Sequence, residues 1–374
     1  MQKETIRLSK PIIGIEEKNA VLDVLSTERL GMGDVVEKFE NQLGKLLKRE
    51  VTCCVNGTSG LHLALQACGI GVGDEVLVQS MTYVASFQAI SACGATPIPC
   101  DVKANSLTLD VEDVKRKLNP KSKAIMPVHF AGDVGELDAV YELAKANSLR
   151  VIEDGAHAFG SSYKNKKVGS FGDICCFSFD GIKNITSGEG GCVVSNDKKV
   201  ISLIQNARLL GIKNDTEKRF GNTRSWHFDV SNQGWRYHMS DIMAAIGIEQ
   251  LKKLDYFIKR RRKLARLYDA IFLQNDKVTA FNRNYHEVVP HIYSILLPKE
   301  MNRDHLRNKL LDIGIETGVH YMPNHKLSLY KTNEISSLKN TEEIYPRLIS
   351  LPLHPGLEEC HIEYITSEVN KLLG

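Results

Sequence analysis

No stretch of this chain approaches the roughly 20 consecutive apolar residues that a membrane-spanning helix requires. The opening segment MQKETIRLSKPIIG also has no apolar core of the kind found in signal peptides. The 48 basic and 45 acidic side chains leave a net charge of only +3. This balance does not indicate a nucleic-acid or membrane partner. We therefore expect a cytoplasmic protein that binds neither.

The nine cysteines include no CxxC pair, and most of them fall in apolar strand-like or helix-like runs. Buried thiols in a reducing compartment fit this pattern better than disulfides do. The chain also contains neither a GxGxxG motif after its first strand-like run nor a Walker loop. A nucleotide-dependent oxidoreductase, which strand–helix alternation alone would allow, is disfavoured because that run is followed by NGTSG instead.

Short apolar runs alternate with helix-like segments over roughly the first half of the chain. Several runs are apolar on both faces, which is typical of a sheet covered by helices on both sides. The alternation predicts a mostly parallel sheet of seven strands with right-handed crossovers. The link at 188–191 between the last two runs is too short to hold a helix, so we expect mixed strand direction there. The runs occupy residues 51–55, 75–79, 96–101, 124–129, 150–153, 174–179 and 192–195.

The 374 residues exceed what one core usually fills, so two domains are expected. From about Ser240 long helical spacing sets in, and the basic run at 259–263 within it is interpreted as a solvated helix face. We predict an α/β fold with a large domain over residues 1–240 and a smaller α+β domain over residues 241–374. The later elements are expected as a strand at 291–297, a helix at 303–311 ended by Gly314, a strand at 315–321 and a helix at about 358–373.

The segment NGTSG at 56–60 joins the first strand to a helix. Glycine permits close backbone approach, and a helix N-terminus offers free N–H groups to an anion. This predicts a phosphate cradle at Gly57 and Thr58, with the alternative that Thr58 or Ser59 is only an N-cap. Tyr83 opens the helix after the second strand. It is interpreted either as a core residue or as a stacking partner for a flat ring.

Lys183 lies in a polar loop between the last two strands, five residues after Ser178. Asp154 ends the fifth strand, either as a capping residue or as a partner for a protonated ring nitrogen. Only His157 lies near it, so we expect no metal site. All these positions fall at one edge of the predicted sheet. One ligand would use them together: pyridoxal 5′-phosphate, whose aldehyde forms a Schiff base with lysine and whose pyridinium needs an acid.

The chain resembles the sugar aminotransferases of the DegT/DnrJ/EryC1/StrS family, within the fold-type I pyridoxal-phosphate enzymes. The similar stretches occur in the family's order and span most of the chain from about residue 12 to its end. The resemblance implies an aspartate-aminotransferase-like fold and a transaminase that uses pyridoxal phosphate. The stretches are NGTSGLHLALQACGIGVGDEV (56–76), AIMPVHFAGDVGELD (124–138), VIEDGAHAFGSSYKNKKVGSFGD (151–173), FSFDGIKNITSGEGG (177–191), HMSDIMAAIGIEQL (238–251) and IETGVHYMPNH (315–325).

The resemblance also implies a role for each matching residue. Lys183 would hold the cofactor covalently and carry a proton, Asp154 would keep the pyridine nitrogen protonated, and Tyr83 would stack on the ring. Arg236 stands where many relatives have asparagine, and in a homodimer with shared active sites it would bind the neighbour's cofactor phosphate or the substrate's diphosphate. His157 would contact the cofactor's ring hydroxyl or the opposite face of its ring. The cofactor's phosphate would be bound by Gly57, Thr58 and Ser178, and the substrate would be bound by Asn184 and His320.

The implied reaction moves an amino group from glutamate to a nucleotide-linked keto-deoxysugar, a precursor of lipopolysaccharide O-antigen or another glycan. The stretches IKNIT and DGAHAFG favour C4 of a 4-keto-6-deoxyhexose, with amination at C3 as the alternative. A related 3-dehydratase would have histidine in place of Lys183. A non-catalytic regulator or binding protein would be expected to have lost Asp154, Lys183 or Ser178. The sequence does not distinguish UDP, dTDP and GDP.

Overall fold

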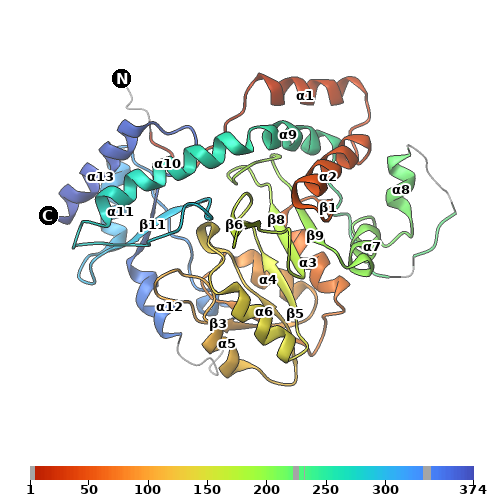
Figure 1. Cartoon of the computed structure of the whole chain (residues 1–374), viewed down its shortest axis with the longest axis horizontal. Helices are drawn as coiled ribbons and strands as arrows, with labels where there is room; N and C mark the ends of the chain where they lie inside the picture. Colours follow the sequence, from red (N-terminus) through yellow and green to blue (C-terminus); the bar gives the residue numbers. More distant parts are fainter. Residues whose placement is uncertain (1–4, 222–226, 231, 332–337) are drawn as a thin grey trace.

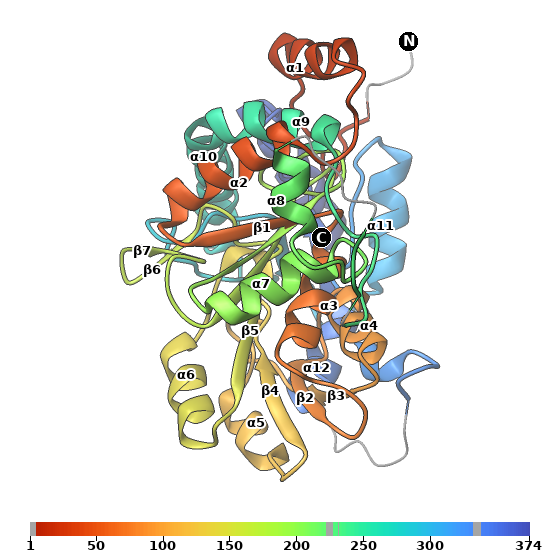
Figure 2. The ribbon, with the colours of Figure 1, turned by 90° about the vertical axis from the view of Figure 1, so that its right-hand side faces the viewer.

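The computed structural model describes residues 5–221, 227–230, 232–331 and 338–374. Its centre is a seven-stranded sheet in the order β1-β9-β8-β5-β4-β2-β3 (Figures 1 and 2). β9 is antiparallel to both of its neighbours, and the other neighbouring pairs are parallel. The seven predicted strands and the mixed direction at the last one are confirmed. The strands are β1 (Glu50–Cys54), β2 (Glu75–Gln79), β3 (Thr96–Cys100), β4 (Ser122–Met126), β5 (Arg150–Asp154), β8 (Ile174–Ser178) and β9 (Gly191–Ser195).

Helices cover both faces of this sheet. Along β8, Cys175 and Phe177 belong to one apolar core and Cys176 to the other, because successive side chains of a strand point to opposite faces. The first core includes residues of α2 and α9, and the second includes residues of α3, α4 and α7. The helices of this part are α1 (Ile15–Ser26), α2 (Asp34–Leu47), α3 (Gly57–Ala67), α4 (Val84–Ala92), α5 (Val111–Lys117), α6 (Leu137–Ala146), α7 (Lys198–Ala207), α8 (Asp215–Phe220) and α9 (Asp241–Lys252).

A second, antiparallel sheet has its own apolar core near the C-terminus. Figure 1 shows it at one end of the molecule, with α7 and α8 at the other. This core begins at Leu264, whereas Ala244 and Ile248 of α9 pack in the core of the large sheet. The domain boundary after residue 240 stays a prediction. The elements are β10 (Thr279–Ala280), β11 (Tyr293–Leu296), β12 (Leu348–Leu351), α10 (Leu254–Phe272), α11 (Arg303–Asp312), α12 (Lys339–Ile344) and α13 (Glu359–Leu373).

The strand expected at 315–321 is wrong. Ile315 and Gly318 form only isolated bridges, the first with Ile6 near the N-terminus and the second with Ser350. The backbone bonds of this segment are divided between two partners, because Glu316 donates to the Ile6 carbonyl at 3.0 Å while Gly318 exchanges two bonds with Ser350 on the outer edge of β12. Gly314, with φ of +84°, ends the turn after α11 as predicted.

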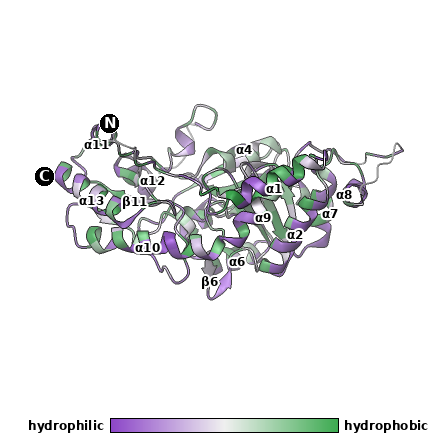
Figure 3. Ribbon diagram, turned by 90° about the horizontal axis from the view of Figure 1, so that it is seen from above, coloured by the Kyte–Doolittle hydropathy of each residue, from purple (hydrophilic) through white to green (hydrophobic). Residues whose placement is uncertain are grey.

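The basic run in α10 is not a solvated face throughout. Arg261 is 1 % exposed, and its guanidinium donates to the carbonyls of His291 (3.0 Å) and Leu353 (3.2 Å). These bonds tie α10 to segments of the second sheet that lie far away in sequence, which periodicity cannot reveal. Figure 3 shows polar and apolar residues interspersed along α10. Among the helices in the described ranges, none is both long enough and apolar enough to cross a bilayer.

Candidate active site

Four strands of the large sheet, β1, β2, β5 and β8, run in the same direction and end at one cavity of about 440 Å³. This volume is within the range of small-molecule sites, and the carboxyl edge of a parallel sheet is their usual place. The cavity brings together most of the residues that the sequence singles out. Its lining includes Gly57, Thr58, Tyr83, Asp154, His157, Ser178, Lys183 and His320.

The N-terminus of α3 meets the end of β8 at the edge of this cavity. A Cβ atom at Gly57 would lie 2.9 Å from the Cβ of Ser178, so the close approach requires glycine. The N-cap is Asn56, whose Oδ1 accepts from the Ser59 amide at 2.8 Å. The interpretation of Thr58 or Ser59 as the cap is therefore wrong. Because the first two amides of a helix have no partner within it, those of Gly57 and Thr58, with the Ser178 hydroxyl, fit a phosphate group.

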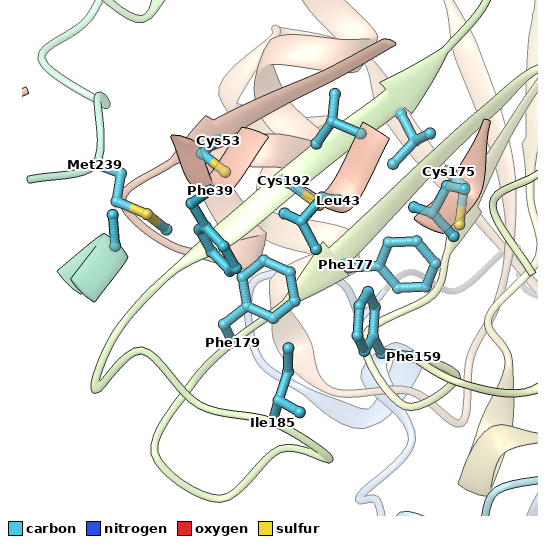
Figure 4. Packing of buried hydrophobic residues seen from close by; sticks show 14 of the residues in the cluster. Phe39, Leu43, Cys53, Phe159, Cys175, Phe177, Phe179, Ile185, Cys192 and Met239 are labelled. Carbon is cyan, nitrogen blue, oxygen red and sulfur yellow. The ribbon is translucent and has the colours of Figure 1, made fainter. Parts of the chain in front are cut away.

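Two apolar anchors fix the loop that carries Lys183. Phe179 and Ile185, on either side of it, are both buried in the first core, and Figure 4 shows them close to Phe159. The Phe159 and Phe179 rings meet edge to face, with centroids 5.3 Å apart. Asn184 is also buried, and its side-chain amide donates to the Phe159 carbonyl at 2.9 Å. The structure thus places Asn184 in the interior and outside the cavity lining, away from where a substrate contact was expected.

The Lys183 amine lies in a poorly solvated place. Burial lowers the pKa of this amine to about 8. The nearby carboxylates of Asp180 and Asp154 oppose the shift, and the positive charge of the buried Arg261 lowers the pKa further. A useful fraction of the amine is therefore neutral near physiological pH. A neutral amine is the form that attacks an aldehyde or accepts a proton.

We expect the rate at which the apoprotein takes up pyridoxal phosphate to rise with pH through a midpoint near 8, because a lowered lysine pKa makes the reactive neutral amine dominant above that value. Asp180→Asn should move the midpoint to lower pH, since it removes a charge that favours the ammonium. Stopped-flow absorbance across the pH range measures this rate, with a simple alkylamine as the reference for titration of the cofactor itself. A midpoint at the ordinary lysine pKa would contradict the assignment.

Asp154, only 6 % exposed, lies at the end of β5. Its Oδ1 accepts from the Ala156 amide at 3.2 Å, and its Oδ2 accepts from the Ser86 hydroxyl at 2.7 Å. A carboxylate held in this way, at the wall of a cavity that also contains a lysine, is suited to a cationic ring nitrogen. Ser86 carries no distinguishing signal in the sequence, because a serine in the first turn of a helix resembles an ordinary capping residue.

The protonation of His157 follows from its neighbours. The Ala131 amide donates to Nδ1 at 3.3 Å, so the ring hydrogen is on Nε2, which lies 2.9 Å from the Tyr321 hydroxyl. Burial, and then the charge of Lys183, lower the pKa of His157 well below its usual value, so the ring is neutral. His157 donates to the Tyr321 oxygen, which leaves the Tyr321 hydrogen available for another acceptor. The Tyr83 ring, 60 % exposed, lies 5.6 Å from that of Tyr321.

His320 lines the cavity as expected. Its Nδ1 lies 2.8 Å from the Ser350 hydroxyl, and burial, followed by the charge of Lys183, lowers its pKa to about 4. A neutral histidine can donate to or accept from a sugar hydroxyl without adding charge to the site.

Several lining residues were missed, although each lies next to one that was predicted. Asp180 follows Ser178 by two positions in FSFDG, Thr82 precedes Tyr83, and Tyr321 follows His320. Their position within one or two residues of a predicted site residue at a strand end is the sequence signal that could have identified them. Glu189, after the Lys183 loop, also lines the cavity.

Arg236 is exposed and does not line the cavity. Its backbone forms an isolated antiparallel bridge with Leu209, and the neighbouring Trp235 amide donates to the Ala207 carbonyl at 2.6 Å. The segment is therefore held beside the end of α7, and the Arg236 side chain is exposed. Within one chain this side chain is not part of the site.

Comparison with known proteins agrees with this geometry. The model of the DegT/DnrJ/EryC1/StrS aminotransferase family matches residues 11–370. The chain belongs to this family. It is therefore a sugar aminotransferase of fold-type I, and it depends on pyridoxal phosphate.

Individual members of the family are similar over nearly their whole length. GDP-perosamine synthase of Escherichia coli O157:H7 is 38% identical over 371 residues, which cover 98% of each chain. PseC of Helicobacter pylori, an aminotransferase involved in the biosynthesis of pseudoaminic acid, has a TM-score of 0.91 at 30% identity and 99% coverage of both chains. Spr1654 of Streptococcus pneumoniae, in its PLP form, has a TM-score of 0.89 at 28% identity, covering 99% of this chain and 98% of its own.

Proposed function

We propose that this aminotransferase moves an amino group from glutamate to C4 of a nucleotide-linked 4-keto-6-deoxyhexose, supplying an aminosugar for a surface polysaccharide or another glycan. The main support for transamination is one cavity that joins the Lys183 amine, the Asp154 carboxylate and a phosphate cradle at Gly57. The name of the GDP-perosamine synthase supports a sugar carried on a nucleoside diphosphate. The choice of C4 over C3 rests on the IKNIT and DGAHAFG stretches.

The residues present fit the cofactor. When bound, pyridoxal phosphate forms a Schiff base with a primary amine, and its ring accepts the electron pair of a bond broken at the adjacent carbon. The amides at the start of α3 and the Ser178 hydroxyl would hold its phosphate, because glycine at position 57 lets the start of α3 come close to Ser178. Asp154 would accept a hydrogen bond from the ring nitrogen. The exposed Tyr83 ring would cover one face.

Lys183 has two functions in this proposal. Its Nζ would hold the cofactor covalently until an amino donor takes its place. The free amine, with its pKa lowered to about 8, would then accept a proton from the α-carbon of the donor and deliver it as an acid. With the keto sugar, Lys183 would move the proton in the opposite direction.

The half-reaction with glutamate tests the proposal without knowledge of the sugar. Added to the yellow holoenzyme, glutamate should reversibly remove the visible absorbance and release 2-oxoglutarate in an amount equal to the active sites. Alanine and aspartate serve as comparison donors. Release of another keto acid in preference to 2-oxoglutarate would overturn glutamate as donor, and amination at C3, seen by NMR of the product from candidate keto sugars, would overturn C4.

We also propose a homodimer in which each chain completes the cavity of the other. The outer surface of α1, which lies at the edge of the molecule in Figure 2, exposes Leu22 (58 %) and Leu25 (45 %), and Ile15 (62 %) is exposed at its start. Such grouped apolar side chains are typical of association surfaces. The outward-facing Arg236 would then reach the partner's cavity, where a guanidinium can bind phosphate through two parallel hydrogen bonds.

A further inference from the structure

A hydroxyl from a separate element is bonded to Asp154. Ser86 lies in the first turn of α4 with no exposed surface, and its Oγ is 2.7 Å from Asp154 Oδ2. An ionised carboxylate only accepts hydrogen bonds, so Ser86 is the donor. Its one hydroxyl hydrogen is then used. In the 3.0 Å contact between the Thr82 and Ser86 hydroxyls, Thr82 is therefore the donor.

The hydrogen-bonded series from Thr82 through Ser86 to Asp154 is poorly solvated. Ser86 has no exposed surface, Thr82 is 1 % exposed, and Asp154 is 6 % exposed at the cavity wall. The main chain of Asp154 is fixed as well, because its amide donates to the Pro127 carbonyl at 2.9 Å and its carbonyl accepts from the His129 amide at 3.0 Å. Hydrogen bonds to a charged group in such surroundings are among the stronger ones in proteins.

We propose that Ser86, supported by Thr82, is a positioning residue that holds the Asp154 carboxylate oriented toward the pyridine nitrogen of the cofactor. The inference rests on the proposed role of Asp154. The bond from the Ser86 hydroxyl fixes one carboxylate oxygen of Asp154. A carboxylate held in place in this way favours a proton on the ring nitrogen that it faces. Without the Ser86 hydroxyl, the carboxylate loses this fixed orientation, and the ring nitrogen is protonated less readily.

A pH titration of the visible absorbance of the holoenzyme, without substrate, measures this effect. A protonated ring nitrogen withdraws electrons from the bond between Lys183 and the cofactor, and so makes the nitrogen of that bond more acidic. Ser86→Ala should therefore raise the titration midpoint, by about one pH unit, which is a tenfold change in the equilibrium. Ser86→Thr keeps the hydroxyl and should keep the wild-type midpoint.

Ser91→Ala is the matched control, because Ser91 lies on the same helix and its hydroxyl bonds to Tyr330 at 3.4 Å, outside the cavity lining. Its midpoint should equal that of the wild type. A shift in Ser91→Ala as large as in Ser86→Ala would assign the effect to the helix as a whole and overturn the inference.

Asp154→Asn separates this inference from the proposed function. It should raise the midpoint further than Ser86→Ala does, or release the cofactor. A wild-type midpoint in Asp154→Asn overturns the role of Asp154 and the inference with it. If the midpoint shifts in Asp154→Asn but not in Ser86→Ala, the inference about Ser86 is overturned and the role of Asp154 stands. If Ser86→Ala does not fold, Thr82→Val decides: a smaller rise is expected, and a wild-type midpoint overturns the proposal.

Discussion

Replacing Lys183 with alanine is expected to lower kcat by about 10⁴-fold or more, since in the proposed mechanism one side chain provides both the covalent attachment and the proton transfer. Among the described residues that line the cavity, no other lysine is present to take its place. The cofactor should still bind, because the phosphate cradle and Asp154 remain. The amino sugar should therefore stay covalently bound to it. Single-turnover kinetics and the persistence of visible absorbance after adding the sugar product would show both effects.

Two control variants distinguish the loss of the nucleophilic amine from the loss of positive charge and from a non-specific effect of removing a lysine. Lys183→Arg keeps the positive charge without a nucleophilic amine and should be as inactive as Lys183→Ala. Lys166→Ala alters an exposed lysine on a short surface strand and should leave kcat unchanged. A small primary amine added to Lys183→Ala should restore part of the proton transfer. Turnover of Lys183→Ala within about tenfold of the wild type would show that the lysine assignment is wrong, because proton transfer alone is worth more than that.

Most of the site could be predicted from the sequence because of the topology of a parallel sheet. Apolar runs that end in polar residues, such as the one that ends at Asp154, place those residues at the carboxyl edge when the strands run in parallel. Gly57 and Ser178, 121 positions apart in the sequence, meet there for the same reason. Periodicity and strand ends are local signals, and the sheet converts them into one location in space.

What could not be predicted depends on contacts between distant segments. Asn184 is adjacent to Lys183, yet the packing of Phe179 and Ile185 turns its side chain toward the Phe159 carbonyl. The ring hydrogen of His157 is assigned by the amide of Ala131, 26 residues earlier. Neither effect leaves a pattern in the sequence around the residue concerned.

The same limit applies to the second sheet and to α10. The segment 315–321 has the composition of a strand, but its backbone bonds are divided between Ile6, near the N-terminus, and Ser350 of β12. Arg261 has the appearance of a surface charge, although it is fully enclosed and lowers the pKa of Lys183. Its influence on the reactive amine depends on where α10 lies, which follows from the packing of both cores.

Mixing Lys183→Ala with Arg236→Ala, two impaired variants, is expected to restore activity if the active sites are shared. Arg236→Ala alone should weaken cofactor binding by about 10- to 100-fold, the usual effect of losing a hydrogen bond to a charged group. Lys183→Ala alone is inactive. In a randomly paired mixture, half of the dimers contain one chain of each kind, and one of their two cavities has both residues intact. Measured below cofactor saturation, activity should return to about one quarter of the wild-type value.

The matched control is a mixture of Lys183→Ala and Asp154→Asn, whose altered residues both line the cavity of their own chain. Every cavity in that mixture lacks one of the two, so no recovery is expected there. If Arg236 acted within its own chain, the first mixture would recover no more activity than the second. Sedimentation velocity at the assay concentration checks the premise, because a monomer would contradict shared sites directly. If activity recovers in the mixture with Arg236→Ala but not in the mixture with Asp154→Asn, Arg236 acts in the neighbouring active site. The reason is that mixing changes only which chains are paired in a dimer.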